Sequence, residues 1–464
     1  MPAARGPQPT AHAPSLDIGA HFPALDGLRG LAILLVLIFH ETVMVPNTAF
    51  DRAFLHVAYL GWCGVDLFFV LSGFLITGIL FDTKGTENFF RNFYARRTLR
   101  IFPLYYAVVF FSLIILPAVG QMGLVPPEKF ANFGRIEGNE IWYWLYLSNF
   151  SIANEGRFLH AILDISWSLA IEEQFYLLWP TVVYFCSRRA LMRVCIGLVF
   201  LAIAWRTSLV FGFSRGPFVN PIGVYVMTPG RLDALAIGAW IALAVRVPGG
   251  IERTVAMARK TMPLAAFGVV AFVALDNMRR WFPPDFVDHR DAHSFAGHLM
   301  QCVGYTVFAL FFAALLVLTL TAPAGTALGR FFHWRFMRML GQYSYAMYLF
   351  HLPIRALIRD RVFGPGTASI SPRFHFPTIM GSELPGQLLF YAVSTAATLV
   401  LAWLSWHCFE KHFLKLKRFF PAKRRRAGTP APAGASWQAG AAPPGDPGPQ
   451  SQPHQPRTSS TPVA

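Results

Sequence analysis

Charged residues are scarce in this sequence. Asp, Glu, Lys and Arg make up 14% of its 464 residues, whereas they make up about a quarter of a typical soluble domain. Hydrophobic residues account for 54% of the chain and aromatic residues for 15%. This composition excludes an ordinary soluble domain and is typical of a membrane protein.

Cysteine is also scarce, and its positions are scattered. The chain has five cysteines, with no Cys-x-x-Cys pair and no spacing typical of a metal site. They are Cys63, Cys186, Cys195, Cys302 and Cys408. An odd, dispersed set argues against a disulfide framework and against zinc, so we expect no metal site.

The two ends of the chain lack the features of folded or cleaved segments. Residues 1–21 are polar and rich in Pro and Ala, without the apolar region of a cleavable signal peptide. Residues 421–464 begin with the basic run Lys423–Arg426 and continue as a tail rich in Pro, Gly and Ala, which is typical of disorder. We therefore expect one membrane domain, residues 22–420, between two flexible ends.

Long apolar runs fill most of that domain. A helix needs about 20 mostly apolar residues to cross the hydrocarbon core, so we predict an all-α integral membrane protein with about ten transmembrane helices. Ile141–Phe150 is too short to cross and is interpreted as an interfacial aromatic segment. The predicted spans lie near residues 25–45, 62–81, 101–119, 167–186, 191–212, 229–246, 262–276, 297–321, 340–358 and 386–407.

Basic residues are unevenly distributed among the predicted loops. The net charge is +16. If the first span runs from inside to outside, the inside loops and the tail collect most of the basic residues, and the outside loops carry many acidic ones. This positive-inside pattern predicts that both termini are cytoplasmic. The basic excess then reflects topology and attraction to anionic membrane lipid, and we expect no nucleic-acid binding.

The first predicted span, Ala24–Glu41, keeps three polar residues, Asp26, Arg29 and His40. An Asp or Arg near the centre of a span costs roughly 2.5–3.5 kcal/mol, so residues of this kind indicate function. Arg29 and His40 are eleven residues apart and project from nearly the same face, with a separation of roughly 16 Å along the axis. A snorkelling role for Arg29 and a packing role for His40 remain as alternatives.

Further ionisable residues lie in the predicted outer half of the bundle. They are Asp66 in the second span, Glu172 in the fourth, Arg231 and Asp233 in the sixth, and His351 in the ninth. An intramembrane ionisable residue is a functional candidate. Structural alternatives also fit: a helix-end charge for Asp66, a polar contact for Glu172, an ion pair for Arg231 with Asp233, and a packing histidine for His351.

Arg97 and Arg100 lie one helical turn apart at the predicted cytoplasmic start of the third span. Arginine binds phosphate with two parallel hydrogen bonds, so the pair suits a phosphorylated cytosolic ligand. The alternative is topogenic charge. Together with Arg29, the pair marks the cytoplasmic level, whereas His40 marks the outer level. This arrangement indicates a cytosolic phosphate-bearing donor and chemistry on the far side.

Several motifs in this order resemble the membrane acyltransferase-3 family over most of residues 22–410. They are "LDGLRGLAILLVLIFH", "GVDLFFVLSGFLIT", "ARRTLRIFPLYY", "SWSLAIEEQFYLLWP", "GRLDALAIG" and "YSYAMYLFH". The resemblance implies ten transmembrane helices in a bacterial cytoplasmic membrane, acyl-CoA as donor, and a surface glycan or glycolipid as acceptor. It also implies that His40 and Glu172 are essential for acyl transfer and that Arg97 and Arg100 lie near the donor.

The residues and the resemblance together predict O-acyl transfer from acyl-CoA, with acetyl-CoA as the favoured donor. Arg97 and Arg100, with Arg29, are expected to hold the CoA phosphates. His40 is the expected general base, oriented by Glu172 or Asp66. Direct transfer and a transient acyl-His40 intermediate both fit the sequence.

Arg231, Asp233 and His351 are assigned to binding of the acceptor. The family commonly ends in Glu-x-Pro, but "FEKHFLK" has His412 at the proline position, so Glu410 is assigned no role in the site.

Many relatives carry a fused extracytoplasmic esterase-like domain. Only a short tail follows here, so any second transferase is expected to be a separate extracytoplasmic protein.

A secondary transporter or flippase for an envelope precursor is the alternative function. Intramembrane His, Asp and Glu also build proton relays, which transporters need. Inverted repeats would support this alternative, and none is visible in the sequence.

Overall fold

The structure is a computed structural model of the chain. It describes residues 22–122, 138–158, 162–212, 216, 218–275, 295–363 and 376–421. The predicted flexible segment 1–21 and nearly all of the predicted tail 421–464 lie outside these residues. The described part of the chain is helical and contains no named strand; an isolated bridge joins Ile379 and Ser382. The predicted all-α class is confirmed.

The helices of the first half follow one another closely along the chain. They are α1 (Pro23–Glu41), α2 (Ala49–Tyr59), η1 (Leu60–Cys63), α3 (Gly64–Thr83), α4 (Phe89–Phe110), η2 (Phe111–Ile115), α5 (Leu116–Gln121), α7 (Glu140–Trp144), α8 (Ser148–Glu155), α9 (Ser166–Phe185) and α10 (Arg188–Val210). The predicted interfacial segment therefore forms the two short helices α7 and α8.

The second half adds the remaining helices. They are α11 (Pro221–Val226), η3 (Thr228–Arg231), α12 (Leu232–Ala244), α13 (Gly250–Leu275), α14 (Phe295–Leu299), η6 (Met300–Gly304), α15 (Tyr305–Thr321), α16 (Ala327–His333), α17 (Arg335–Phe363), α18 (Leu384–Ser405), η7 (Trp406–Glu410), α19 (Lys411–Lys415) and η8 (Leu416–Phe419).

Seven helical segments among the described residues are long and apolar enough to cross a membrane. They are Pro23–Glu41, Ala49–Thr83, Phe89–Gln121, Arg188–Val210, Gly250–Ala274, Gly297–Thr321 and Leu384–Phe419. The three other predicted spans are also helical, as α9, α12 and α17. These three helices carry Glu172, Asp233 and His351, and α12 is short, with 13 residues. The structure thus supports a multi-pass membrane protein.

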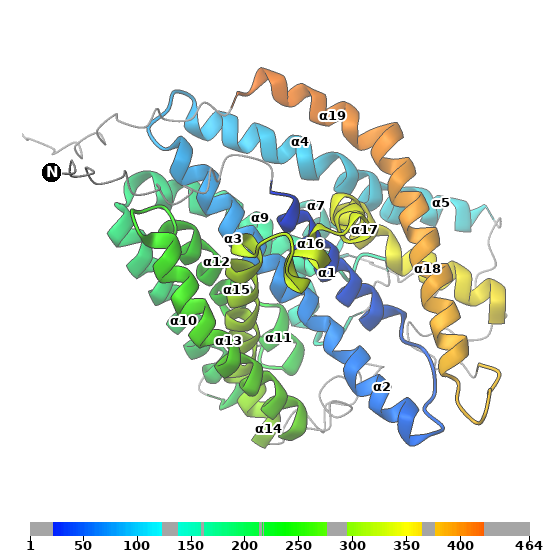
Figure 1. The fold of residues 1–464 in the computed structure, drawn as a ribbon. Helices are drawn as coiled ribbons and strands as arrows, with labels where there is room; N and C mark the ends of the chain where they lie inside the picture. The colour runs from blue at the N-terminus through cyan, green and yellow to red at the C-terminus, as the bar shows by residue number, and fades with distance from the viewer. Residues whose placement is uncertain are drawn as a thin grey trace, which may run out of the picture. The chain divides into compact units, whose positions relative to one another are not determined.

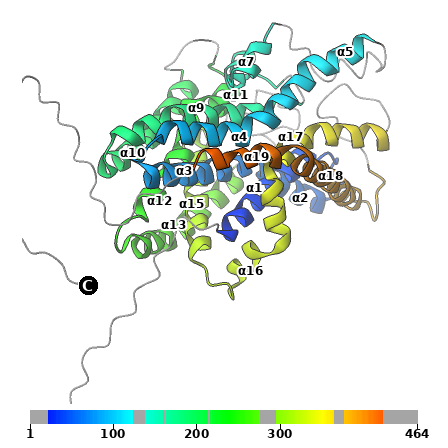
Figure 2. The ribbon, with the colours of Figure 1, turned by 90° about the horizontal axis from the view of Figure 1, so that it is seen from above.

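The bundle has two groups of helices joined by α3. Figures 1 and 2 show α10, α12, α13 and α15 together on one side and α1, α2, α17 and α18 on the other. Helix α3 contacts α12 in the first group and α1 in the second. Helices α4 and α19 lie side by side across one end of the bundle, at the top of Figure 1.

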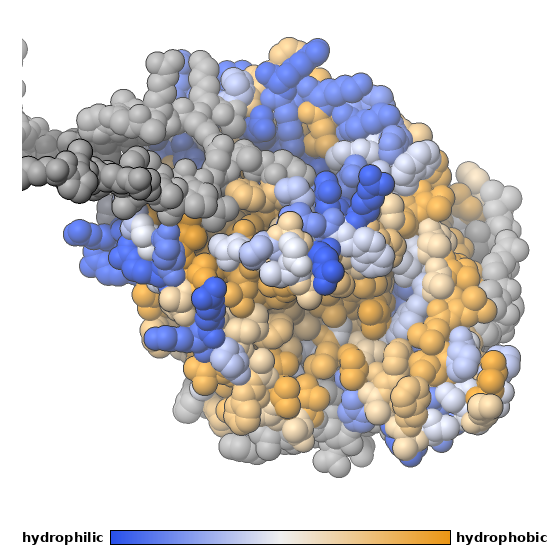
Figure 3. All heavy atoms as spheres, viewed as in Figure 1, coloured by the Kyte–Doolittle hydropathy of each residue, from blue (hydrophilic) through white to orange (hydrophobic). Residues whose placement is uncertain are grey.

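The surface carries large apolar side chains on the outer helices. Phe200 on α10, Phe267 on α13 and Leu389 on α18 are each at least 66% exposed. In Figure 3 hydrophobic residues cover much of the lower part of this face, and hydrophilic residues gather along the upper edge over α4 and α19. Exposed apolar area on this scale is typical of a surface that lipid covers.

Two of the motif glycines allow close helix packing. A Cβ added at Gly30 on α1 would lie 2.0 Å from the carbonyl oxygen of Met337 on α17, and one at Gly73 on α3 would lie 1.9 Å from that of Leu235 on α12. Small residues at such crossings bring backbones together where lipid supplies no hydrophobic driving force. The glycines in the first two motifs therefore set the spacing of the helices that carry the candidate site.

Candidate active site

A cavity of about 830 Å³ is lined by basic residues at the end of the bundle that α4 crosses. We call it the basic cavity. Its wall has six arginines and one lysine but a single carboxylate, that of Asp26. The basic residues are Arg29 from α1, Arg96, Arg97 and Arg100 from α4, Arg335 and Arg338 from α17, and Lys417 from η8. Such a wall suits a ligand with several negative charges.

The structure brings together the three arginines that the sequence assigned to the donor. Arg29 is paired with Asp26 at 3.3 Å. The guanidinium carbon of Arg97 lies 5.2 Å from the ring centre of Tyr176, and that of Arg100 lies 5.6 Å from the ring of Trp406. The aromatic faces hold the two guanidinium planes in place without neutralising their charge.

Four basic residues of this cavity were missed by the sequence reasoning as site residues. Arg335, Arg338 and Lys417 were interpreted only as topogenic charge, and Arg96 was seen beside Arg97 and Arg100 but was not assigned to the site. Arg96 donates to the carbonyl oxygens of Lys417 and Phe420, at 3.3 and 3.0 Å, which joins the C-terminal segment to α4. The Nε of Arg338 is buried and has no hydrogen-bond partner among the described residues. Arg335 and Arg338 are three residues apart on α17, as Arg97 and Arg100 are on α4. This spacing was the signal that could have revealed them.

A second cavity, of about 130 Å³, adjoins the basic cavity inside the bundle. We call it the inner cavity. Arg29, Arg97 and Arg100 line both cavities. Its other polar lining groups come from α3, α9 and α17, and they are Ser72, Ser168, Glu172, Tyr176, Ser344, Tyr345 and Tyr348. The route predicted to start at the arginines therefore continues into the bundle.

Glu172 lies at this arginine end of the inner cavity. Its carboxylate accepts a hydrogen bond of 3.1 Å from the hydroxyl of Tyr176, which in turn contacts the hydroxyl of Ser72. The sequence reasoning placed Glu172 at the depth of His40. The structure instead places it with Arg97, which carries a charge that attracts the carboxylate. The depth of Glu172 had been counted along the chain from the predicted start of the span, which does not determine which side chains of other helices it meets.

Ser168 and Tyr348 also line the inner cavity. Their hydroxyls lie 2.6 Å apart. The backbone carbonyl of Tyr348 faces the Nδ1 of His351 at 2.7 Å, and the ring centres of the two residues are 5.8 Å apart. Tyr348 therefore both lines the inner cavity and contacts His351.

His40 and His351 lie in contact, although they are 311 positions apart in the chain. The Nδ1 of His40 is 3.2 Å from the Nε2 of His351 and 3.0 Å from the carbonyl oxygen of Val36. His351 is fully buried. The partners of the His40 ring are thus Val36 and His351, and not the carboxylates of Glu172 or Asp66 that the sequence reasoning suggested.

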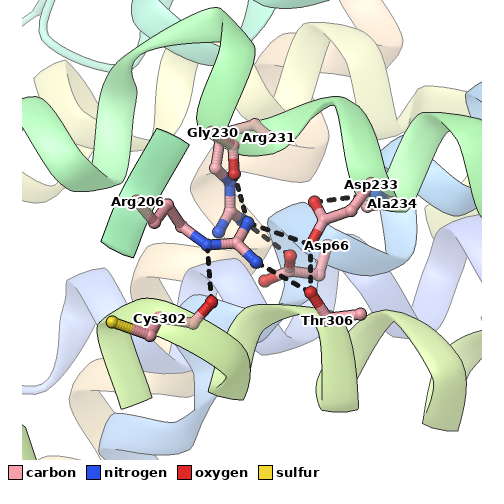
Figure 4. Close-up of polar contacts among 8 residues, drawn as sticks. All are labelled: Asp66, Arg206, Gly230, Arg231, Asp233, Ala234, Cys302 and Thr306. Atoms are coloured by element: carbon pink, nitrogen blue, oxygen red, sulfur yellow. Dashed lines mark hydrogen bonds and ion pairs between the residues drawn. The ribbon is translucent and has the colours of Figure 1, made fainter. Parts of the chain in front are cut away.

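Asp66 belongs to a buried network of charges elsewhere in the bundle (Figure 4). It pairs with Arg231 at 2.6 Å, and Asp233 pairs with Arg206 at 2.9 Å. Thr306 donates to Asp233 at 2.6 Å and accepts from Arg206 at 2.7 Å. All four charged side chains are at most 1% exposed. The network links α3, α10, α12 and α15, which supports a packing role.

Arg231 is further enclosed by aromatic rings. Its guanidinium carbon lies 4.4 Å from the ring centre of Tyr305, 5.1 Å from that of Tyr225 and 5.7 Å from that of Phe69. Arg206, which the sequence reasoning missed, donates to the carbonyl oxygens of Gly230 and Cys302 as well as to Asp233. An arginine inside an apolar helix was the signal that could have revealed it, since the same signal marked Arg29.

The segment after α1 is fixed by side chains of α18. The side-chain oxygen of Gln387 accepts from the backbone N–H groups of Val43 and Met44 at 2.8 and 2.9 Å. Its side-chain amide donates to the carbonyl oxygen of Glu41 at 2.9 Å. Glu383 accepts from the N–H of Val45 at 3.0 Å. These bonds hold the end of the helix that carries His40.

No group of three or more His, Cys, Asp or Glu side chains able to hold a metal ion occurs within the described residues. The side chains gathered around the two cavities and the histidine pair present imidazole, carboxylate, hydroxyl and guanidinium groups. A phosphate-bearing ligand in the basic cavity and a histidine base beyond the inner cavity are what the arrangement can support.

Comparison with known proteins agrees with this chemistry. Residues 22–407 match a family model described as an acyltransferase domain. The chain is 29% identical over 353 residues to a putative peptidoglycan O-acetyltransferase of Bacillus subtilis, covering 73% of this chain and 49% of that protein. It is 29% identical over 350 residues to the peptidoglycan O-acetyltransferase OatA of Listeria monocytogenes, covering 73% of this chain and 50% of that protein.

The O-acetyltransferase OatA of Staphylococcus aureus is similar to the same extent, with 28% identity over 349 residues, covering 73% of this chain and 51% of that protein. The chain thus spans about half the length of the curated relatives it matches. No solved structure is a significant match.

Proposed function

This chain belongs to the acyltransferase-3 family, and from that premise we propose that it transfers an acetyl group from acetyl-CoA to a hydroxyl of a cell-envelope carbohydrate. The relatives named as peptidoglycan O-acetyltransferases support a glycan as the acceptor. Glycolipids that present the same sugar hydroxyls belong to the same proposal.

The basic cavity is the observation that carries the proposal. Coenzyme A carries a diphosphate and a 3′-phosphate, and these groups match a wall of six arginines and one lysine. A proton-driven transporter needs intramembrane titratable groups but has no need for so many fixed positive charges at one mouth. The shared arginines then connect donor binding with the interior of the bundle.

His40 acts as the general base in this proposal. It removes the proton from the acceptor hydroxyl while the oxygen attacks the thioester carbonyl carbon. The bond between carbon and sulfur breaks, and the CoA thiolate takes the proton back from the imidazolium. General-base catalysis of this kind contributes typically 10²–10⁴-fold to the rate. Arg29 and His40 lie at opposite ends of α1, so roughly 16 Å of helix separates phosphate binding from this chemistry.

Other parts of the proposal concern the membrane. The seven apolar segments together with α9, α12 and α17 form ten crossings in a bacterial cytoplasmic membrane, with both termini and the basic cavity in the cytoplasm. The acceptor approaches from the opposite side, and a separate extracytoplasmic acyltransferase completes delivery to more distant glycans. The charge distribution among the loops supports this orientation.

Replacement of His40 tests the function. We expect purified His40→Ala protein in proteoliposomes to bind acetyl-CoA but to lose acetyl transfer to glycan, by at least about 10²-fold. His333→Ala is the matched control, because His333 on α16 also makes a backbone contact, to Gly329 at 2.8 Å. Undiminished transfer by the His40→Ala protein would refute the proposal. Movement of a glycan precursor without consumption of acetyl-CoA would instead establish a transporter.

A further inference from the structure

We infer that His351 is a positioning residue that fixes the tautomer of His40, so that Nε2 of His40 is the basic nitrogen. The inference rests on the proposed role of His40 in acyl transfer and extends it to a residue on another helix. It assigns to an imidazole the role that the sequence reasoning gave to a carboxylate.

The contacts form a single chain of hydrogen bonds from α1 to α17. The carbonyl oxygen of Val36 lies 3.0 Å from Nδ1 of His40. That Nδ1 lies 3.2 Å from Nε2 of His351, and Nδ1 of His351 lies 2.7 Å from the carbonyl oxygen of Tyr348. The two imidazole rings are tilted by 50°, with centres 4.9 Å apart.

The two carbonyl groups decide where the protons are. A carbonyl oxygen only accepts, so Nδ1 of His351, which faces Tyr348, must carry a hydrogen. The neutral ring then leaves Nε2 of His351 as an acceptor, and it can accept only if Nδ1 of His40 carries a hydrogen. The same hydrogen also suits the carbonyl oxygen of Val36. Nε2 of His40 is therefore the nitrogen with the free lone pair, and it has no hydrogen-bond partner among the described residues.

No carboxylate near His40 in the described part of the chain takes the role of orienting its ring. The carboxylate nearest in sequence, Glu41, accepts from Ser394 at 2.9 Å and Thr395 at 3.3 Å on α18 and not from His40. Arg355, one turn further along α17, is the charged group that acts electrostatically on both histidines. Arg355 also acts on Glu41. No carboxylate within the described residues is hydrogen-bonded to either imidazole ring, so His351 is the side chain that orients His40, together with the backbone carbonyl of Val36.

The fixed tautomer suits the transfer step. Nε2 of His40 takes the proton of the acceptor hydroxyl, which leaves an imidazolium with hydrogens on both nitrogens. The Nδ1–H of that imidazolium is held by Val36 and His351 while Nε2 returns its proton to the CoA thiolate. Without His351, Nδ1 of His40 keeps only the carbonyl oxygen of Val36 as a partner, and a share of the enzyme would carry the hydrogen on Nε2, which could then accept no proton.

Two variants of His351 separate positioning from mere packing. In His351→Gln the side-chain carbonyl can still accept from Nδ1 of His40, whereas in His351→Leu it cannot. We expect His351→Leu to lower kcat by at least about 10²-fold with KM for acetyl-CoA within about twofold of wild type. We expect His351→Gln to recover at least about tenfold of that loss. His333→Leu is the control and should leave kcat unchanged.

A spectroscopic measurement tests the tautomer without relying on turnover. We expect solid-state NMR of ¹⁵N-histidine-labelled protein in proteoliposomes to show His40 with hydrogen on Nδ1 alone. The signals of His40 are identified among the 14 histidines by their loss in His40→Gln. In His351→Leu, the tautomer with hydrogen on Nε2 should appear.

The outcomes distinguish this inference from the proposed function. A His40 ring protonated on Nε2 in the wild type, or an unchanged kcat in His351→Leu, would overturn the inference while acetyl transfer stands. Equal loss in the Gln and Leu variants, with a raised KM, would also overturn it. Absence of acetyl transfer in the wild type would refute the proposed function, and the NMR spectrum would still report the tautomer.

Discussion

Arg231 and Asp66 form an ion pair across 2.6 Å between η3 and α3, and neither side chain is more than 1% exposed. One oxygen of Asp66 and two nitrogens of Arg231 are buried without hydrogen-bond partners among the described residues. Each charge therefore depends on the other, because neither has water to stabilise it. The pair is a condition for packing α12 against α3.

Asp66→Ala should destabilise the protein by roughly 3–5 kcal/mol, because it leaves the Arg231 charge buried and uncompensated. The measurement is denaturant unfolding of the protein in detergent. Asp82→Ala is the matched control, since Asp82 pairs with Arg246 at 2.7 Å but is 28% exposed. We expect the control to lose about 1 kcal/mol or less. If Asp66→Ala unfolds like the wild type but has no turnover, Asp66 has a chemical role instead.

Arg338→Ala should raise KM for acetyl-CoA without a comparable change in kcat. Arg338 lines the basic cavity at a distance from the histidines, and a hydrogen bond to a charged group is worth roughly 1.5–3 kcal/mol, which is about 10- to 150-fold in affinity. Initial rates at varied acetyl-CoA concentration give both constants. Arg330→Ala, in exposed α16, is the control and should change neither. An unchanged KM for Arg338→Ala would remove α17 from the donor site.

Arg97→Ala and Arg100→Ala should also weaken donor binding, and more steeply at low ionic strength. Charge attraction in an open cavity is screened by salt, so the gap in affinity between wild type and variant should narrow as salt rises from about 0.01 to 0.15 M. Acetyl-CoA binding measured by calorimetry at several salt concentrations tests this. Identical salt dependence in the wild type and both variants would argue against contact with phosphates.

Gly30→Val should prevent normal packing of α1 on α17. Even its Cβ would lie 2.0 Å from the carbonyl oxygen of Met337, so the two backbones must separate. We expect a loss of at least about 2 kcal/mol in unfolding free energy, together with lost turnover. Gly197→Ala on α10 is the control, because nothing lies within 4 Å of its added Cβ. The control should gain about 0.5–1 kcal/mol from helix propensity. Similar effects of the two changes would contradict the packing argument.

The sequence predicted the helical fold and the arginine cluster because both depend on short-range patterns. Apolar runs of sufficient length indicated the helices of the ten predicted spans, although not short ones such as α2 and α16, and Arg97 and Arg100 are neighbours on one turn. The packing partners of the glycines inside the apolar motifs could not be named from the sequence. A helix crossing depends on which helices are adjacent, and this information is not local in the sequence.

The pairing of ionisable groups could not be predicted. Asp66 and Arg231 are 165 positions apart, and His40 and His351 are 311 apart. Counting depth along ideal, upright helices placed Glu172 beside His40. In the structure it lies with Tyr176 and near Arg97. Position along a helix does not determine which neighbouring helix a side chain faces, and a shift of one ångström or two is enough to exchange one hydrogen-bond partner for another.

Arg29, Arg97 and Arg100 line both the basic cavity and the inner cavity. An anion that settles among them necessarily alters the electric field felt by Glu172 and Tyr176, without the displacement of any backbone. Binding of an anionic donor in the basic cavity thus changes the electrostatic potential in the inner cavity, and this coupling requires no conformational change.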